Sequence, residues 1–244
     1  MKYFDLEGHL AREHKRTALS VYLREIVYVG NDGIVTTFAV VAGFAGATQD
    51  PTRSSIPFIA VLIFGLANLF ADALSMSLGS FLSLRSDQDM YRKERRKEIE
   101  EIRDNPKAEV EESVEILTRK GFSEKDARTI TSLYQKNQPY WIEFMMKDEL
   151  EMSNPEHESP VFIALSTFAS FVLFGIIPLL PYFLRIPGDT FQYSIMATAA
   201  ALILLGVLRS NISRIRPILA VSETVVVGGV AAVVAYMVGT FFRI

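Results

Sequence analysis

Glutamates recur at helical spacing in the charged segment of residues 85–160. Glu98 and Glu101 are three positions apart, and so are Glu109 and Glu112. A spacing of three places both carboxylates of a pair on the same face of a helix. If the helices that carry these two pairs converge, their carboxylate oxygens can bind one divalent cation together.

Thioethers accompany a fifth carboxylate further along this segment. The stretch "FMMKDELEM" contains Met145 and Met146, and Glu149 follows Met145 by one helical turn. Carboxylate oxygens alone suit Mg²⁺ or Ca²⁺, whereas added thioether sulfur favours softer first-row ions such as Fe²⁺. A plainer interpretation stays open, because "RKERRKEIEEIR" interleaves acids with bases as solvated helix faces do.

Acidic residues also occur inside two long apolar stretches. Asp32 lies in "VYVGNDGIVTTFAVVAGFAGA". Asp72 and Met76 lie one helical turn apart in the next apolar stretch, with Asn68 one turn earlier. An ionised acid at the centre of a membrane helix costs about 2.5–3.5 kcal/mol, so each acid needs compensation. A cation, or a proton that replaces it, would compensate the charge, whereas simple packing would also explain Met76.

Two further acids, Glu25 and Glu223, lie near the ends of apolar stretches. Acids at such positions reach the membrane–water interface, which is a sufficient explanation for both. Glu25 is nonetheless retained, with Asp32, as a candidate for proton coupling.

Apolar residues gather in five blocks, which excludes an ordinary soluble domain although the chain also carries many charges. Each block reaches the roughly 17–25 residues that a membrane-spanning helix needs. The sequence therefore predicts an all-α membrane protein with five transmembrane helices and a cytoplasmic helical metal-binding domain inserted between the second and third. The blocks cover about residues 27–47, 56–84, 160–184, 190–208 and 218–242.

Basic residues mark alternate connections between these blocks. The first 24 residues hold five and residues 209–216 hold three, whereas the other two short connections and the C-terminal tail hold one each. The segment 85–160 holds 14 basic and 19 acidic residues. The positive-inside rule places the N-terminus, this segment and residues 209–216 in the cytoplasm. The acidic balance of the segment disfavours nucleic acid as a partner.

The segment 85–160 also carries signals for helix ends. No glycine or proline interrupts the run from the second apolar block into charge, so one long helix is predicted there. Pro106 and Ser123 then start further helices, and Gly121 stops one. The predicted helices end near Arg103, Gly121, Asn137 and Met152. In the third apolar block, "GIIPLLPYFL" predicts a broken end because it contains two prolines.

Several stretches resemble, in the same order, those of the vacuolar iron transporter family. The resemblance covers about residues 20–242, and several independent motifs in register are far more specific than any one of them. The stretches are "LREIVYVGNDGIVTTFAVVAGFAGA", "GLANLFADALSMSLGSFLSLRSDQDMY", "WIEFMMKDELEM", "FVLFGIIPLLPYF" and "SETVVVGGV".

The resemblance implies a homodimer with a translocation path at the dimer interface, lined by the first two spans. It implies that Asp32 and Met76 hold the ion in the membrane. It implies seven further ligands in the cytoplasmic domain: Glu98, Glu101, Glu109, Glu112, Met145, Met146 and Glu149. Plant-type members have a glutamate where this chain has Asn68, and we expect Asp72, one turn later, to take that role.

The family's activity is export of Fe²⁺, often also Mn²⁺, from the cytosol in exchange for protons. The leading hypothesis is therefore a transporter of Fe²⁺, Mn²⁺, Co²⁺ or Zn²⁺ as substrate ion, with no permanently bound cofactor. A di-iron oxidase is disfavoured, because His9, His14 and His157 complete no Glu-x-x-His motif. A third hypothesis is a metal sensor or buffer that binds ions without moving them.

The predicted organisation has four parts. Residues 1–25 form an amphipathic interfacial helix, 26–84 the first two spans, 85–159 the cytoplasmic metal-binding domain, and 160–244 the last three spans. Expected partners are a divalent ion, protons, membrane lipid and a second copy of the chain. The first apolar block lacks a cleavage site, which fits a bacterial inner membrane, and the family resemblance adds a vacuolar-type membrane.

Overall fold

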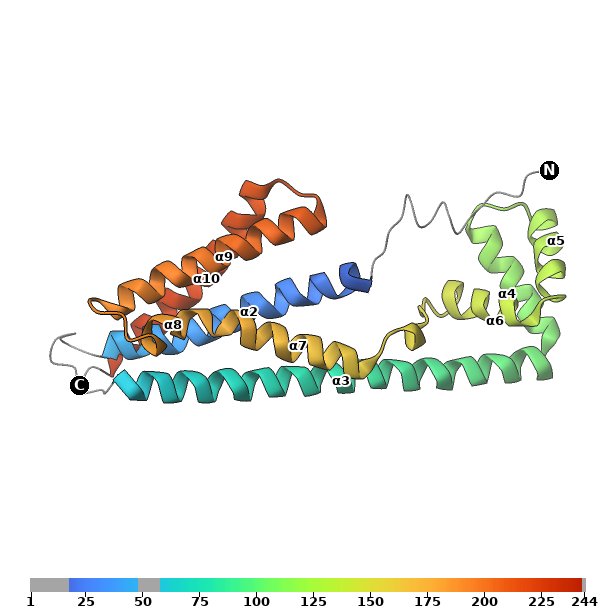
Figure 1. Cartoon of the computed structure of the whole chain (residues 1–244). Coiled ribbons are helices and arrows are strands. Elements are labelled where there is room, and N and C mark those ends of the chain that lie inside the picture. Colours follow the sequence, from blue (N-terminus) through green and yellow to red (C-terminus); the bar gives the residue numbers. More distant parts are fainter. Residues whose placement is uncertain (1–17, 48–57, 243–244) are drawn as a thin grey trace. The chain divides into compact units, whose positions relative to one another are not determined.

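The computed structural model describes residues 18–47 and 58–242, and every regular element in these ranges is helical (Figure 1). Long apolar runs without a strand-like alternation explain this uniformity. The elements are α2 (Ala18–Ala47), α3 (Phe58–Asp104), α4 (Pro106–Arg119), α5 (Glu124–Tyr134), α6 (Gln138–Asp148), η1 (Pro155–His157), α7 (Pro160–Gly175), η2 (Ile177–Leu179), α8 (Leu180–Phe183), α9 (Thr190–Ser213) and α10 (Pro217–Phe241).

Five stretches of the described chain are long and apolar enough to cross a membrane, which confirms the predicted number of spans. They are Ile26–Ala47, the apolar part of Phe58–Asp104, Pro160–Phe183, Thr190–Ser213 and Pro217–Phe241. The many exposed large apolar side chains on these helices fit contact with lipid rather than water. The chain is a multi-pass integral membrane protein.

The chain divides into two compact units. The bundle unit comprises Met1–Ser80 and Val161–Ile244, and the middle unit comprises Phe81–Pro160. The first part of α3 belongs to the bundle unit and its last part to the middle unit. Residues 18–25, the described part of the predicted interfacial segment, form the start of α2, which runs without a break to Ala47.

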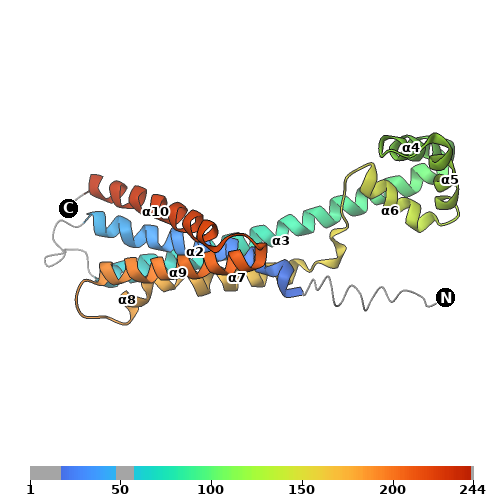
Figure 2. The same ribbon diagram turned by 90° about the horizontal axis from the view of Figure 1, so that it is seen from above.

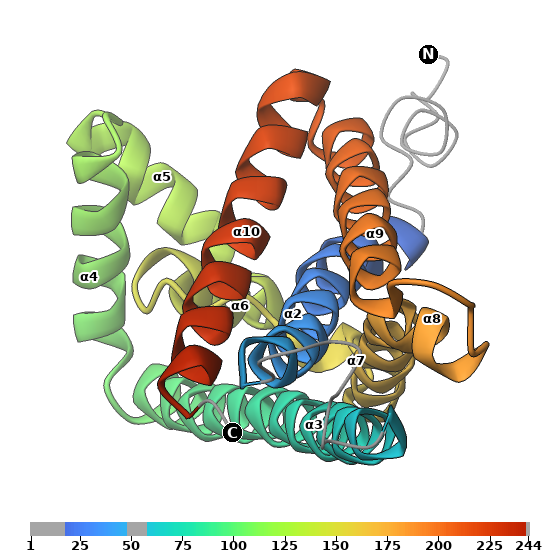
Figure 3. The same cartoon turned by 90° about the vertical axis from the view of Figure 1, so that its left-hand side faces the viewer.

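In the bundle unit, α2 lies between α9 and α10 on one side and α3 and α7 on the other (Figure 3). Glycines allow the closest approaches. A Cβ atom added to Gly33 would lie 2.7 Å from the backbone oxygen of Phe171 in α7. A Cβ atom added to Gly239 of α10 would fall on the carbonyl oxygen of Gly43 in α2. These contacts bring the helix backbones together as small residues do in membranes.

The third span breaks where the sequence predicts. α7 ends at Gly175, and the short helices η2 and α8 follow, with Pro178 and Pro181 near their starts. Proline lacks a backbone N–H and clashes with the preceding turn, so it interrupts a continuous helix. The backbone carbonyl of Pro178, in this broken region, accepts a hydrogen bond from Ser194 Oγ of α9 at 2.7 Å inside the bundle.

In the middle unit, α4, α5 and α6 lie beside the last part of α3 (Figure 2). Pro106 occupies the first turn of α4, and Gly121, with φ of 99°, follows its end. The Ser123 hydroxyl accepts a hydrogen bond from the Asp126 N–H at 3.2 Å and so caps α5. The observed starts of α4 and α5 confirm the predicted ones.

The middle unit has its own buried core. It contains Tyr91, Ile102, Val114, Leu117, Ala127, Trp141, Ile142, Phe144, Met145 and Met146.

Two helices of the middle unit end earlier than the sequence predicts. α5 ends at Tyr134, because Asn137 already serves as the N-cap of α6. α6 ends at Asp148 rather than Met152. The backbone of Glu151 adopts a left-handed conformation, and the next N–H donates to the carbonyl six residues earlier, which closes the helix.

We expect Gly239→Ala to destabilise the bundle unit, because its new methyl group would displace α2. Overpacking of this kind costs about 1–3 kcal/mol. Gly229→Ala, in the same helix, is the matched control, since a Cβ atom there meets nothing within 4 Å. Thermal unfolding of the purified protein in detergent measures the difference. Equal midpoints for the two variants would contradict the close packing of α2 and α10.

Candidate metal sites

Three carboxylates from three elements meet in the middle unit. Glu98 of α3, Glu109 of α4 and Glu149, directly after α6, each offer an oxygen atom, and these atoms lie within 4.8 Å of one another. Glu98 and Glu109 are only 3% and 5% exposed, whereas Glu149 is exposed. The structure thus brings together one glutamate from each of the three predicted helices.

Local folding explains how each carboxylate is placed. Glu109 lies in the first turn of α4, where the partial positive charge of the helix N-terminus favours a carboxylate. Glu149 lies at the C-terminus of α6, where the helix dipole disfavours one. Trp141 Nε1 donates to Ser113 Oγ at 2.8 Å, which fixes α6 against α4. The site therefore depends on packing between helices.

Burial and mutual repulsion perturb all three acids. Burial, followed by the charge of Glu109, raises the pKa of Glu98 to about 8. Burial, followed by the charge of Glu112, raises the pKa of Glu109 to about 6 and also raises that of Glu149. The buried Glu98 Oε1 and Glu109 Oε2 atoms have no hydrogen-bond partner among the described residues. A divalent cation would satisfy these oxygens and offset the repulsion.

Glu101 and Glu112, the remaining predicted carboxylates, lie around this group. The negative charges of both residues repel Glu109 and Glu149, so they act on the same group of carboxylates. Glu101 Oε1 lies 3.4 Å from Lys97 Nζ, and Glu112 is exposed. They strengthen the negative potential and remain predicted ligands.

The predicted thioether ligands lie in the hydrophobic core of the middle unit. Met145 and Met146 are at most 1% exposed. The sulfur of Met145 accepts a hydrogen bond from Ser113 Oγ at 3.2 Å. This contact gives Met145 a structural role in holding α6 against α4. A role of either sulfur in binding an ion stays a prediction.

In the bundle unit, the predicted acids of two spans interact. Asp32 of α2 and Asp72 of α3 are close enough for their charges to repel. Asn68 Nδ2 donates a hydrogen bond of 2.8 Å to Asp72 Oδ2, which orients that carboxylate. Met76 packs against a buried cluster that includes Leu69 and Phe171. Two carboxylates and a nearby thioether on adjacent helices are suited to a transition-metal ion.

The glycines beside Asp32 determine which way it faces. A Cβ atom on Gly30 would meet Phe174, and one on Gly33 would meet the backbone of Phe171. Both glycines therefore lie against α7. Successive residues of a helix are about 100° apart, so Asn31 and Asp32 point elsewhere. Asp32 interacts with α3, and Asn31 lines a cavity against α9 and α10.

The other two acids near span ends differ in what the structure describes. The side chain of Glu25 lies outside the described part of the chain. Glu223 Oε2 lies 2.8 Å from Arg209 Nη1 and thus forms an ion pair between α10 and α9. The sequence did not predict this ion pair, nor that Asn31 lines a cavity beside it. The available signal was one charge of each sign at facing ends of consecutive spans.

The raised pKa of Glu98 predicts that stability of the metal-free protein depends on pH. Between about pH 4.5 and pH 8 the folded state keeps a proton that the unfolded chain releases, so this contribution is lost as pH rises. The free energy of unfolding of Glu98→Gln, relative to that of the native protein, should therefore increase as the pH rises from 5.5 to 8.5. The gain should reach at least about 1.4 kcal/mol, the value of one pKa unit.

Chemical denaturation of chelator-treated protein in detergent measures this gain. Glu100→Gln is the matched control, because Glu100 lies on the same helix and is exposed. Parallel pH profiles for Glu98→Gln and the native protein would show that Glu98 does not hold the proton.

Comparison with known proteins gives the family. The family model described as the VIT family matches residues 23–240. Vacuolar iron transporter 2 of Oryza sativa subsp. japonica is 33% identical over 215 residues, which cover 88% of this chain and 85% of that protein. A vacuolar iron transporter of Centaurea cyanus is 34% identical over 226 residues, 92% of this chain and 89% of that protein. Vacuolar iron transporter 1 of Arabidopsis thaliana is 34% identical over 216 residues, with coverages of 88% and 83%. The chain belongs to the VIT family, whose named members here are transporters and not enzymes.

Proposed function

We propose that this protein moves Fe²⁺, and also Mn²⁺, out of the cytosol in exchange for protons. The observation that carries the proposal is the group of Glu98, Glu109 and Glu149 in a chain that also has an acid pair among its membrane helices. The names of the relatives support iron as the substrate. A homodimer is part of the proposal and rests on the family resemblance.

The middle unit is the metal-collecting domain in this proposal and lies in the cytoplasm. The alternation of basic residues along the chain supports that side, as it does for the N-terminus and residues 209–216. Its carboxylates form a hard, anionic site that captures a hydrated divalent ion. Because Glu98 and Glu109 are buried and unpaired at one oxygen each, ion binding relieves an existing electrostatic cost.

The membrane step uses Asp32, Asp72 and Met76. An ion between Asp32 and Asp72 neutralises two carboxylates that otherwise repel each other in a medium of low dielectric constant. When the ion leaves, protons restore neutrality. This exchange couples the two fluxes, because the pair cannot lose the ion and stay fully charged without a large cost.

Ligand chemistry supports Fe²⁺ and Mn²⁺ over Zn²⁺. The group of three glutamates contains no cysteine or histidine, so it offers little to Zn²⁺, which prefers nitrogen and thiolate ligands. A role as sensor or buffer shares the middle-unit site, so only ion movement separates it from transport. An oxidase gains no support, since the candidate metal-binding group found among the described residues contains glutamates alone.

Asp32→Ala should abolish metal flux, because it removes the carboxylate of α2 that interacts with Asp72. The measurement is Fe²⁺ and Mn²⁺ uptake into proteoliposomes with an imposed pH gradient. Asp189→Asn is the matched control, because Asp189 is an exposed helix cap in the bundle unit and asparagine also caps helices. Undiminished flux in Asp32→Ala would remove this residue from the mechanism.

Replacing Glu98 and Glu101 by glutamine should raise the KM for the metal roughly tenfold, the effect of losing about 1.4 kcal/mol of binding. The maximal rate should be retained, because the membrane carboxylates are intact. Glu100→Gln again serves as control, and competition among Fe²⁺, Mn²⁺, Co²⁺ and Zn²⁺ gives the selectivity. Metal binding without uptake by the native protein would favour the sensor or buffer.

A further inference from the structure

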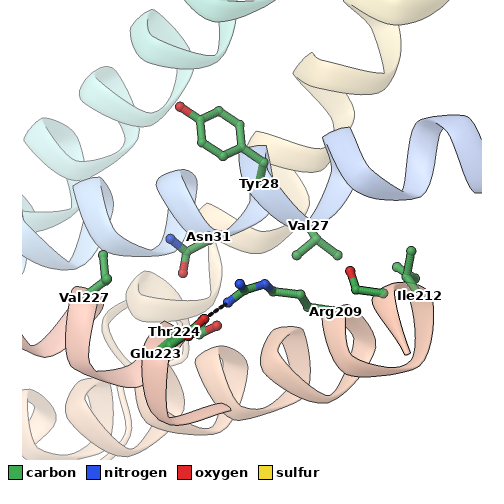
Figure 4. Close-up of a pocket in the computed structure, with 9 residues that line it drawn as sticks. Val27, Tyr28, Asn31, Arg209, Ile212, Glu223, Thr224 and Val227 are labelled. Atoms are coloured by element: carbon green, nitrogen blue, oxygen red, sulfur yellow. Dashed lines mark ion pairs between the residues drawn. The ribbon is translucent and has the colours of Figure 1, made fainter. Parts of the chain in front are cut away.

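A cavity of about 640 Å³ lies between α2, the end of α9 and the start of α10 (Figure 4). Its polar wall includes the ion pair of Arg209 and Glu223, whose side chains are both partly exposed. Its apolar wall includes Val27, Ile212 and Val227. The cavity thus has a charged part and an apolar part, and neither belongs to the proposed metal sites.

The charged part offers one group of each sign and an unsatisfied acceptor. Arg209 extends toward Glu223, and the oxygen of Asn31 points from α2 toward this pair (Figure 4). Asn31 Oδ1 is buried and has no hydrogen-bond partner among the described residues. A buried acceptor without a donor is costly, so a ligand that brings a donor gains from meeting it.

We propose that this cavity binds the headgroup of a phosphatidylethanolamine molecule of the surrounding membrane. The phosphate binds the guanidinium of Arg209, and the ammonium donates to the carboxylate of Glu223 and to Asn31 Oδ1. A lone phosphate would be repelled by Glu223, and a lone ammonium by Arg209. A zwitterionic headgroup satisfies both charges at once.

The position of the cavity fits a lipid better than a soluble metabolite. Arg209 lies near the end of α9 and Glu223 in the second turn of α10, and helix ends lie at the level of the headgroups. Val226, Val227 and Val230 of α10 are each more than half exposed. This apolar helix face continues from the cavity and can contact the acyl chains.

The hydrogen-bonding requirement separates ethanolamine from choline. A choline ammonium carries three methyl groups and no N–H, so it gives Asn31 Oδ1 no donor and Glu223 no hydrogen bond. Hydrogen bonds to charged groups are strong enough that we expect a preference of roughly tenfold for ethanolamine. Phosphatidylglycerol, which is anionic, should bind less well because it has no positive charge to pair with Glu223.

Native mass spectrometry of the purified full-length protein, without metal, tests the proposal. The lipids are phosphatidylethanolamine, phosphatidylcholine and phosphatidylglycerol with identical acyl chains, and free phosphoethanolamine is a fourth ligand. The native protein should retain phosphatidylethanolamine preferentially. Glu223→Gln and Asn31→Leu should lose the preference for phosphatidylethanolamine over phosphatidylcholine. Arg209→Gln should lose retention of both of these lipids. Arg216 is an exposed basic residue nearby, and Arg216→Gln should change neither the preference nor the retention.

Three results would overturn the proposal. Equal or better retention of phosphatidylglycerol would mean that the cavity recognises only negative charge. Equal binding of free phosphoethanolamine would mean that the acyl chains are not recognised. Efficient disulfide crosslinking of Ser213→Cys between two copies, which the cysteine-free chain allows to be measured cleanly, would mean that a second copy covers the cavity.

Discussion

A carboxylate that is withdrawn from water needs a proton, a hydrogen-bond donor or a cation beside it, and this constraint governs both units of the protein. In the bundle unit, Asn68 donates to Asp72, but Asp32 adds a second negative charge. In the middle unit, Glu98 and Glu109 are buried beside other acids, and one oxygen of each lacks a donor. A fold that needed only stability would replace such groups with apolar ones. Their presence together supports the proposal that an exchangeable positive charge binds at both places.

Local spacing predicted the helices and the faces on which the acids lie. The proline and glycine signals around α4 and the broken third span needed no tertiary information, because they act through the backbone of their own segment. Spacing could not rank the acids within a face. Glu109 is buried and Glu112 is exposed, although both lie on one face of α4, since burial depends on how α3 and α6 pack there.

Contacts between distant segments were the part that the sequence could not supply. Met145 shares a helix face with Glu149, which predicts a ligand, yet its sulfur accepts a hydrogen bond from Ser113 of another helix. Arg209 and Glu223 each look like an interfacial charge when considered alone. Their pairing, and the cavity beside it, arise only when α9 and α10 pack against each other and against α2.

The helix α2 connects the two features of the bundle unit through consecutive residues. Asp32 interacts with Asp72 of α3, whereas Asn31 lines the cavity beside α9 and α10, because neighbouring residues of a helix point about 100° apart. Gly30 and Gly33 hold this part of α2 closely against α7, so the backbone between them has little freedom to rotate alone. A shift of α2 at the cavity must therefore also move Asp32. A lipid that fixes Asn31 would restrain Asp32, the carboxylate of the proposed membrane site, and the two adjacent residues would then link lipid binding to the proposed ion path.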